Sequence, residues 1–334
     1  MSYKSQGRDL SVGMIRFISM IFIVFCHFLQ FYEKESAWWL NIGVQIFLCI
    51  SGFLYAKKEI TDDVAFISNT FKKILIPFYL YIFSILPFYF LFFNGRFLMS
   101  EVGYTLFLSS RLPGLEHLWY VPYILLCYLF TPLLSEFCKK IHEFKNSKFV
   151  IVLFLTVAII DIFLISFTRF LNAAWVSLYV TSYLISYRLF HNKITMKNIL
   201  TWLVPLCLVS TSFRIYFTYF FSVSSTAAAL IVNKGILYSR ACLGITLFFA
   251  LYVLFNKINL DRVFTKKIIF LSDKYSYTIY LTHHIYILGP FGIMTFFSSS
   301  YLNILFATIL IVISGWLLKT IESGVKRLSS SRFS

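Results

Sequence analysis

Long apolar runs recur along this chain, and they constrain its fold more than any other feature. About 20 apolar residues in a helix span the hydrocarbon core of a bilayer. Ten segments reach or approach this length: 13–32, 38–56, 74–93, 117–135, 149–167, 173–190, 199–221, 235–255, 275–297 and 300–318. They predict an all-α polytopic bundle of about ten transmembrane helices. We expect residues 1–334 to form one domain with no appended soluble domain.

The composition agrees with this prediction. Charged residues make up 13% of the chain and hydrophobic residues 59%, whereas soluble domains carry roughly 25% charged residues. The formal net charge of +16 could suggest a nucleic-acid partner, but the basic residues fill short gaps between apolar runs. We therefore expect a lipid bilayer as partner and no nucleic acid. The cysteines lack the spacing of metal ligands, so no metal site is predicted.

The distribution of basic residues predicts the orientation, because cytoplasmic loops carry an excess of Lys and Arg. With a cytoplasmic N-terminus, 21 of the 30 basic residues fall in segments on the cytoplasmic side and five in segments on the other side. The remaining four lie within helices or at their edges. This bias places both termini in the cytoplasm.

Ionisable residues inside the membrane are costly, so they are functional hypotheses by default. Arg16 and His27 are separated by eleven residues, which is about three helical turns and about 16 Å. They therefore share one helix face, with Arg16 near the cytoplasmic end and His27 in the outer half. A neutral imidazole at its usual pKa of about 6.5 can accept a proton from a hydroxyl. The alternative is a snorkelling arginine and a packed histidine.

The other polar residues fall into two sets by depth. The inner, cationic set fits a cytosolic anion such as a phosphorylated cofactor, and it contains Arg16, Lys72 and Lys73, with His283 as an optional member. The outer set fits a polar acceptor and acid–base chemistry, and it contains His27, Glu116, His117, Asp161, Arg214 and Arg240. Asp161 could join the two arginines in a buried acid–base cluster or form a purely structural ion pair. Trp119 and Tyr120 could stack on a sugar or anchor the chain at the interface.

Five short motifs follow one another along nearly the whole chain. They are Arg16-x10-His27; Gly43-Val44-Gln45-Ile46-Phe47 running to Ser51-Gly52-Phe53; His117-Leu118-Trp119-Tyr120 with Tyr128 and Pro132; Ser276-Tyr277 with Tyr280-Leu281-Thr282-His283; and Ile321-Glu322. With these motifs in this order, the chain resembles members of the membrane-bound acyltransferase-3 family. This family includes bacterial O-acetyltransferases of surface polysaccharides and IcaC-like proteins. The sequence departs from the pattern of this family at two places. Gln45 stands where many members have Asp, and Lys72-Lys73 stands where many have Arg-x-x-Arg.

The resemblance implies ten helices, an acyl-CoA donor bound from the cytoplasm and a carbohydrate hydroxyl as acceptor. It makes His27 the essential residue and places Arg16 on the donor side. We expect Lys72 and Lys73 to help hold the donor phosphates, although lysine lacks the bidentate geometry of arginine. His27 would act as general base or relay the acyl group.

We therefore expect an O-acyltransferase, and specifically an O-acetyltransferase, in a bacterial plasma membrane. Acetyl-CoA or another acyl-CoA would be the donor substrate, with no permanently bound cofactor. The acceptor would be a surface polysaccharide, such as an exopolysaccharide or lipopolysaccharide, or its lipid-linked precursor, and polysaccharide-assembly proteins are candidate partners. The alternatives are a glycan or lipid-linked sugar transporter or flippase, a succinyltransferase of the IcaC-like type, and a non-catalytic scaffold. Substrate contacts are expected at Glu116, His117, Trp119, Tyr120, Asp161, Arg214, Arg240 and His283.

Overall fold

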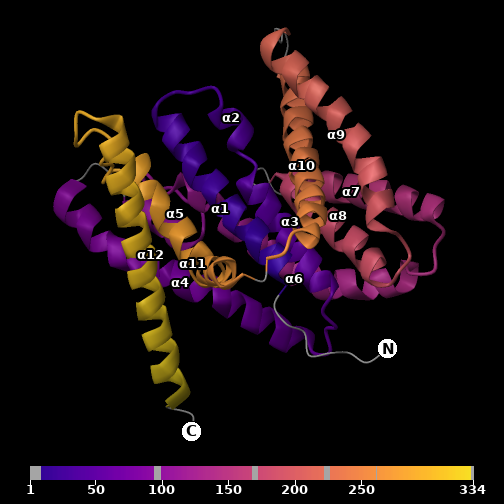
Figure 1. Ribbon diagram of the computed structural model, residues 1–334, viewed down its shortest axis with the longest axis horizontal. Helices are drawn as coiled ribbons and strands as arrows, with labels where there is room; N and C mark the ends of the chain where they lie inside the picture. The colour runs from indigo at the N-terminus through magenta and orange to yellow at the C-terminus, as the bar shows by residue number, and fades with distance from the viewer. Residues whose placement is uncertain (1–8, 94–98, 168–171, 222–225, 261, 332–334) are drawn as a thin grey trace. The chain divides into compact units, whose positions relative to one another are not determined.

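The computed structural model describes residues 9–93, 99–167, 172–221, 226–260 and 262–331, and every regular element in these ranges is helical (Figure 1). The predicted all-α class is confirmed. Ten of the described helices are long: α1 (Leu10–Phe31), α3 (Gly43–Ala56), α4 (Asp63–Phe93), α6 (Tyr120–Ile141), α7 (Asn146–Phe167), α8 (Ala173–Phe190), α9 (Met196–Tyr219), α10 (Thr226–Lys257), α11 (Val263–Ile287) and α12 (Ser300–Ser331). The short elements are α2 (Ala37–Leu40), α5 (Met99–Leu106) and the 3-10 helix η1 (Glu116–Trp119).

Eight helical segments in the described ranges are long and apolar enough to cross a membrane. Helices α8 and α11 are the two long helices outside this set. Most of α8 is buried against other helices, so it can carry polar residues without exposing them to lipid. The first half of α11 is polar and includes Lys266, Lys267, Asp273 and Lys274. The chain is a polytopic helical membrane protein, while its predicted orientation stays a prediction.

Several predicted helix starts are wrong for the same physical reason. Helix α11 spans Val263–Ile287 instead of the predicted 275–297, and α4 and α10 also begin earlier than predicted. Lys72 and Lys73 were expected before a helix but lie inside α4, and Lys234 was expected in an outer loop but lies inside α10. With 31 and 32 residues, these helices are well over 40 Å long at 1.5 Å per residue. They exceed the hydrocarbon core of about 30 Å, so charged residues continue the helix where the apolar run stops.

The chain divides into two compact units. Unit 1 comprises residues 1–19, 42–63 and 126–269, and unit 2 comprises residues 20–41, 64–125 and 270–334. The division falls within α1, α6 and α11, so each of these helices contributes residues to both units. The expectation of a single domain stays a prediction.

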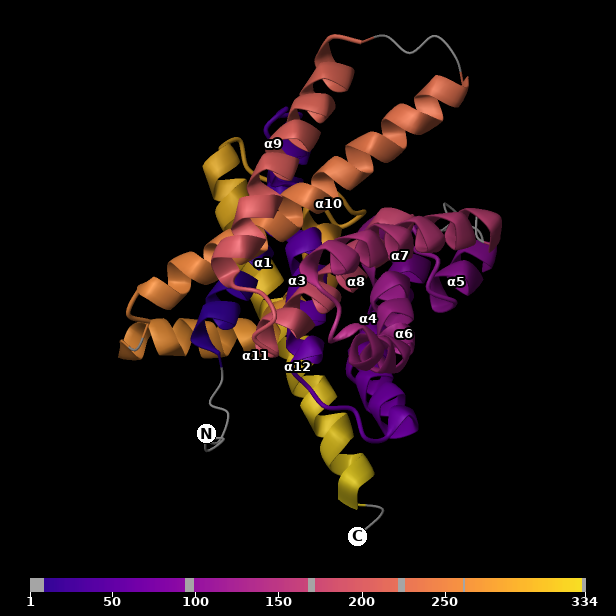
Figure 2. The same cartoon turned by 90° about the vertical axis from the view of Figure 1, so that its right-hand side faces the viewer.

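In unit 1, α3 packs closely against α8. A Cβ atom at Gly52 would lie 2.7 Å from the backbone oxygen of Tyr179, so only glycine permits this approach. Near this contact the Ser182 hydroxyl donates a hydrogen bond to the backbone oxygen of Cys49 over 2.9 Å. Small residues at helix contacts are typical of membrane bundles. Helix α10 packs against both α3 and α9 (Figure 2).

In unit 2, the end of α1 packs against α11 and α12. The apolar core there contains Phe28, Ile287, Met294, Ala307 and Ile311. The segment between α5 and η1 is also held in place. The buried Thr105 hydroxyl oxygen accepts hydrogen bonds from the backbone N–H groups of Arg111 and Leu112 over 3.1 and 3.0 Å. This anchoring fixes the chain that leads into η1.

Candidate active site

Four of the six histidines lie together in unit 2. His27 comes from α1, His117 from η1, and His283 and His284 from α11. The ring centroid of His27 lies 5.1 Å from that of His283 and 4.7 Å from that of His284. The ring centroid of His117 lies 5.0 and 4.7 Å from the same two rings. We call these four residues the histidine group.

The two histidines of α11 are fixed by backbone carbonyls. His283 lies with Nδ1 2.7 Å from the backbone oxygen of Tyr280, and His284 lies with Nδ1 2.8 Å from the backbone oxygen of Gly114. A carbonyl oxygen only accepts hydrogen bonds, so Nδ1 carries the proton in both rings. In the neutral imidazole, the lone pair is then on Nε2.

The other two rings obey the same rule. His117 Nε2 lies 3.1 Å from the backbone oxygen of Leu281, and His27 Nδ1 lies 2.6 Å from Oε1 of Gln30. Both nitrogens must donate, because both partners are acceptors. The neutral rings keep their lone pairs on Nδ1 of His117 and on Nε2 of His27. Each member of the histidine group therefore keeps one ring nitrogen as an acceptor.

Exposure separates His27 from the other three rings. His27 is half-buried, whereas His117, His283 and His284 are buried. Among the described residues, His117 Nδ1 and His283 Nε2 have no hydrogen-bond partner, although buried polar atoms usually have one. Lone pairs of this kind suit a ligand that brings O–H donors. His27 is the member that such a ligand reaches first.

The segment before η1 positions this group. Gly114 has φ +80°, and a Cβ atom there would lie 2.5 Å from Cδ of Pro290 and 2.6 Å from Cα of Gly289. Glycine is required on both grounds. Its backbone N–H donates to Oε1 of Glu116 over 3.1 Å, while its carbonyl binds His284. Glu116 is exposed and interacts electrostatically with His284, so one loop holds both a carboxylate and an imidazole.

The aromatic residues after His117 lie at the same place. Tyr120 is buried, with its ring centroid 5.5 Å from that of Tyr280. The Tyr280 hydroxyl donates to the backbone oxygen of His117. Trp119 is half-buried and packs on Tyr123 with centroids 5.5 Å apart. The roles of Trp119 and Tyr120 as sugar platforms or interface anchors stay predictions.

The predicted outer set is divided between the two units. His27, Glu116 and His117 lie in unit 2, whereas Asp161, Arg214 and Arg240 lie in unit 1. His283 contacts His27 and His117, so its optional place in the inner set is wrong. The sequence did not predict that His283 lies with His27 and His117. Residues were assigned to the two sets by their depth in the membrane, and His283 is near mid-depth in its helix, where depth does not decide between the sets.

Asp161 has a different partner from those expected. Its carboxylate accepts hydrogen bonds from Lys234 Nζ over 2.8 Å and from the Tyr238 hydroxyl over 3.1 Å. Arg240 instead lies 5.5 Å from the centroid of the Trp175 ring, a cation–π contact. Arg214 is completely buried and lies close enough to Arg240 for electrostatic repulsion. We call Asp161, Arg214, Lys234 and Arg240 the charged group.

The residues of the predicted donor side also lie in different units. Arg16 is half-buried in unit 1 and interacts electrostatically with Tyr55 and Tyr128. Lys72 and Lys73 are exposed on α4 in unit 2. Their role in holding phosphates stays a prediction.

Four residues of these sites were not predicted to belong to them: His284, Gln30, Gly114 and Lys234. The consecutive pair His283-His284 in an apolar helix was a signal for His284. Adjacent helical residues point about 100° apart, so the sequence alone does not show that both rings reach one site. In the structure both rings contact His27 and His117.

In the part of the chain that the structure describes, no group of three or more His, Cys, Asp or Glu residues could hold a metal ion.

Comparison with known proteins gives one match. A family model described as an acyltransferase domain, that of the acyltransferase-3 family, matches residues 9–320. The match covers almost the whole chain, including all four members of the histidine group. No curated protein and no solved structure was found to match the chain.

Proposed function

The chain belongs to the acyltransferase-3 family, and we propose that this membrane acyltransferase is an O-acetyltransferase. The donor is acetyl-CoA from the cytosol, and the acceptor is a hydroxyl of a cell-surface polysaccharide or its lipid-linked precursor. The enzyme then resides in a bacterial plasma membrane and contacts polysaccharide-assembly proteins. The observation that carries the proposal is the half-buried His27, whose Nδ1–H is bound to Gln30 so that Nε2 remains a base.

In the proposed reaction, His27 Nε2 takes the proton of the acceptor hydroxyl while its oxygen attacks the acetyl carbonyl carbon. The C–S bond of the thioester then breaks, and the CoA thiolate receives the proton from His27. The imidazolium that exists between these steps carries a positive charge. The neutral rings of His283 and His284 lie against His27, and their lone pairs stabilise that charge.

The remaining predicted contacts complete the proposal. Arg16, Lys72 and Lys73 bind the phosphates of the donor from the cytosolic side. Glu116 is exposed beside the histidine group, which supports a role for its carboxylate in accepting hydrogen bonds from sugar hydroxyls.

The test combines a purified enzyme with the surface glycan. His27→Ala should lower acetyl transfer by about 10² to 10⁴ fold, the usual contribution of a general base, without changing the thermal melting point. His142→Ala is the matched control, because His142 lies between α6 and α7 in unit 1 and packs on His191. Mass spectrometry should show one acetyl group lost from the glycan of a strain that carries His27→Ala.

Other outcomes contradict the proposal in different ways. An unchanged glycan with altered export would identify a transporter or flippase. A mass difference of one succinyl group would replace the acetyl donor by a succinyl donor. Full acetyl transfer by His27→Ala would remove His27 from the mechanism.

A further inference from the structure

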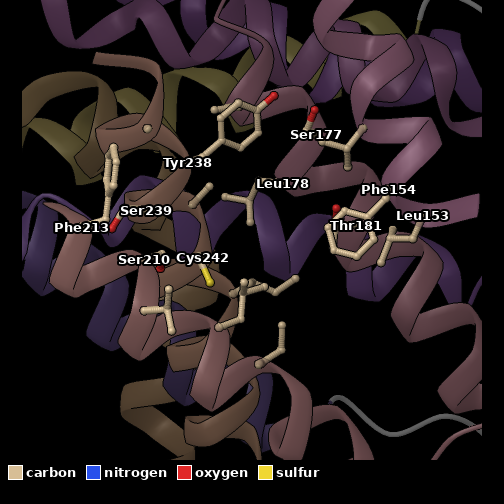
Figure 3. Close-up of a pocket in the computed structure, with 18 of the residues that line it drawn as sticks. Leu153, Phe154, Ser177, Leu178, Thr181, Ser210, Phe213, Tyr238, Ser239 and Cys242 are labelled. Atoms are coloured by element: carbon tan, nitrogen blue, oxygen red, sulfur yellow. The ribbon is translucent and has the colours of Figure 1, made fainter. Parts of the chain in front are cut away.

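Helices α7 and α8 pack against each other in unit 1, and two different sites lie along them. Figure 3 shows the first, a cavity of about 490 Å³ that α9 and α10 also line. Aliphatic and aromatic side chains form most of its wall, and no charged side chain of the described residues lines it. The second site contains charged residues and lies where α8 ends and α7 begins. Its central residue, Arg188, comes three residues after Ile185, the last residue of α8 that lines the cavity.

Arg188 is a cation that the fold buries near the end of α8, where it is 3% exposed. Its Nη2 donates a hydrogen bond to Oδ1 of Asn146 over 2.9 Å. Its Cζ lies 4.5 Å from the centroid of the Phe149 ring, a cation–π contact. Among the described residues, Nε and Nη1 are shielded from solvent and have no hydrogen-bond acceptor, although these nitrogens carry three of the five N–H groups of a guanidinium. Arg188 is therefore held in place on one side and keeps donors for a further ligand.

The guanidinium lies at the positive end of a helix, because Asn146 is the first residue of α7, which has 22 residues. The first N–H groups of a helix have no partner within it, and its N-terminus carries a partial positive charge. Acidic residues often compensate this charge, but the first turn of α7 contains none and includes Lys148 instead. A buried cation and a helix N-terminus thus meet at one place, an arrangement that suits an anion.

One carboxylate lies close to this site and already has other partners. Glu143 belongs to the loop between α6 and α7 and interacts electrostatically with Arg188. Its carboxylate oxygens lie 3.0 Å from Nζ of Lys193 and 3.2 Å from Nε2 of His142. Glu143 therefore compensates part of the charge of Arg188 but leaves Nε and Nη1 without an acceptor. Its side chain is 78% exposed, so it can move and admit a ligand to the two shielded nitrogens.

The chain on both sides of this site is strongly basic. The segments 138–148 and 188–197 together contain seven Lys and Arg residues and one acidic residue, Glu143. The positive-inside rule predicts that both segments face the cytoplasm. An anion that binds there comes from the cytosol or from the cytoplasmic leaflet of the membrane.

We propose that Arg188 and the N-terminus of α7 bind a phosphate group at the cytoplasmic side of unit 1. The free N–H groups of the guanidinium donate charge-assisted hydrogen bonds to phosphate oxygens, and the first backbone N–H groups of α7 donate to another oxygen. The ligand displaces the carboxylate of Glu143 from the neighbourhood of Arg188. The phosphate belongs either to the headgroup of an anionic phospholipid or to a soluble cytosolic molecule, and the two sources are separated by experiment.

Two assays on the full chain distinguish the sources. In the first, the chain is purified in mixed micelles with equal amounts of phosphatidylglycerol and phosphatidylcholine, and native mass spectrometry counts the bound lipid. In the second, the chain in phosphatidylcholine nanodiscs is titrated with inorganic phosphate at constant ionic strength in a calorimeter. Preferential retention of phosphatidylglycerol identifies a lipid headgroup, and binding of inorganic phosphate identifies a soluble ligand. In either assay Arg188→Gln should weaken binding about tenfold, because charge-assisted hydrogen bonds are lost, and Arg188→Lys should weaken it less.

A second pair of variants leaves the buried arginine in place. Glu143→Gln removes the competing carboxylate from an exposed position and should strengthen binding about two- to fivefold. Glu136→Gln is the matched control, because Glu136 is an exposed residue of α6 that pairs with Lys139 over 2.6 Å. It should leave binding unchanged. If Arg188→Gln does not fold, this pair decides.

The absence of binding in both assays would overturn the proposal, and so would binding that a folded Arg188→Gln leaves unchanged. If Arg188→Gln does not fold, equal effects of Glu143→Gln and Glu136→Gln would reveal an effect of general surface charge only and would also overturn it. Because acetyl transfer is not measured, these results are independent of the proposed enzymatic function.

Discussion

The two units bury polar groups in two different ways. The histidine group of unit 2 consists of four imidazole rings, and each is fixed by one acceptor oxygen. The charged group of unit 1 contains the ion pair of Asp161 with Lys234, and two arginines, Arg214 and Arg240, that repel each other. Neutral rings avoid the large cost of burying charge and keep lone pairs for proton transfer. A cation lowers its own cost by pairing with a carboxylate, as Lys234 does with Asp161.

The largest effect is expected in unit 2, when one ring of the histidine group loses its acceptor nitrogen but keeps its aromatic shape. His283→Phe removes the buried Nε2 of a ring whose centroid lies 5.1 Å from that of His27, while the aromatic shape remains. We expect the turnover number for acetyl transfer to fall about 10- to 100-fold, because the imidazolium of His27 loses one stabilising neighbour. Steady-state kinetics with acetyl-CoA measure the turnover number and KM separately.

The KM for acetyl-CoA distinguishes a chemical role for His283 from a structural one. If His283 acts on His27, the KM stays constant while the turnover number falls. His142→Phe serves as control, because it changes a histidine of unit 1 outside both groups. A fall in melting point that accounts for the lost activity would contradict the chemical role.

The loop before η1 should be nearly as sensitive. Gly114→Ala forces a side chain into the left-handed region and against Pro290 and Gly289. Strain of this kind costs about 1–3 kcal/mol, and movement of the loop shifts the carbonyl that holds His284. We expect acetyl transfer to fall about tenfold, with a lower melting point by differential scanning fluorimetry.

Gly103→Ala is the matched control for this loop. A Cβ atom at Gly103 meets no atom within 4 Å, and alanine favours the α5 helix by about 0.5–1 kcal/mol over glycine. The control should therefore be neutral or slightly stabilising. Equal effects of the two substitutions would show that the loop does not position the histidine group.

The hydrogen bond between Gln30 and His27 should have a smaller effect. Gln30→Leu removes the acceptor that keeps the Nδ1 proton of His27 in place, so a fraction of the rings adopts the unproductive tautomer. We expect acetyl transfer to fall about three- to tenfold. Gln30→Glu keeps an acceptor oxygen and should retain more activity than Gln30→Leu, and the reverse order in the same assay would remove Gln30 from the mechanism.

The fold was predictable largely because hydrocarbon thickness sets the length of the apolar runs. The same rule misplaced helix ends at Lys72, Lys73 and Lys234, where helices continue as charged sequence. Helical register singled out His27 and Arg16 as candidates, and their chemical roles stay predictions. The grouping of the histidines was not predictable, because His117 and His283 are 166 residues apart and only tertiary packing brings them together. The Asp161–Lys234 pair was missed for the related reason that Lys234 was assigned to a loop.

The smallest effect is expected in unit 1, at the ion pair of Asp161 and Lys234. Asp161→Asn removes the carboxylate that binds Lys234, while its amide oxygen can still accept the hydrogen bond from Tyr238. Stability should fall by no more than about 1 kcal/mol, because the Lys234 and Asp161 side chains are 44% and 25% exposed. Differential scanning fluorimetry measures this loss as a lower melting point. Lys234→Met should lower the melting point by a similar amount, because it removes the other partner of the same ion pair. If Asp161→Asn instead destabilises the protein much more than Lys234→Met does, the carboxylate stabilises more than this one cation, and a weak, partly exposed ion pair does not describe the charged group.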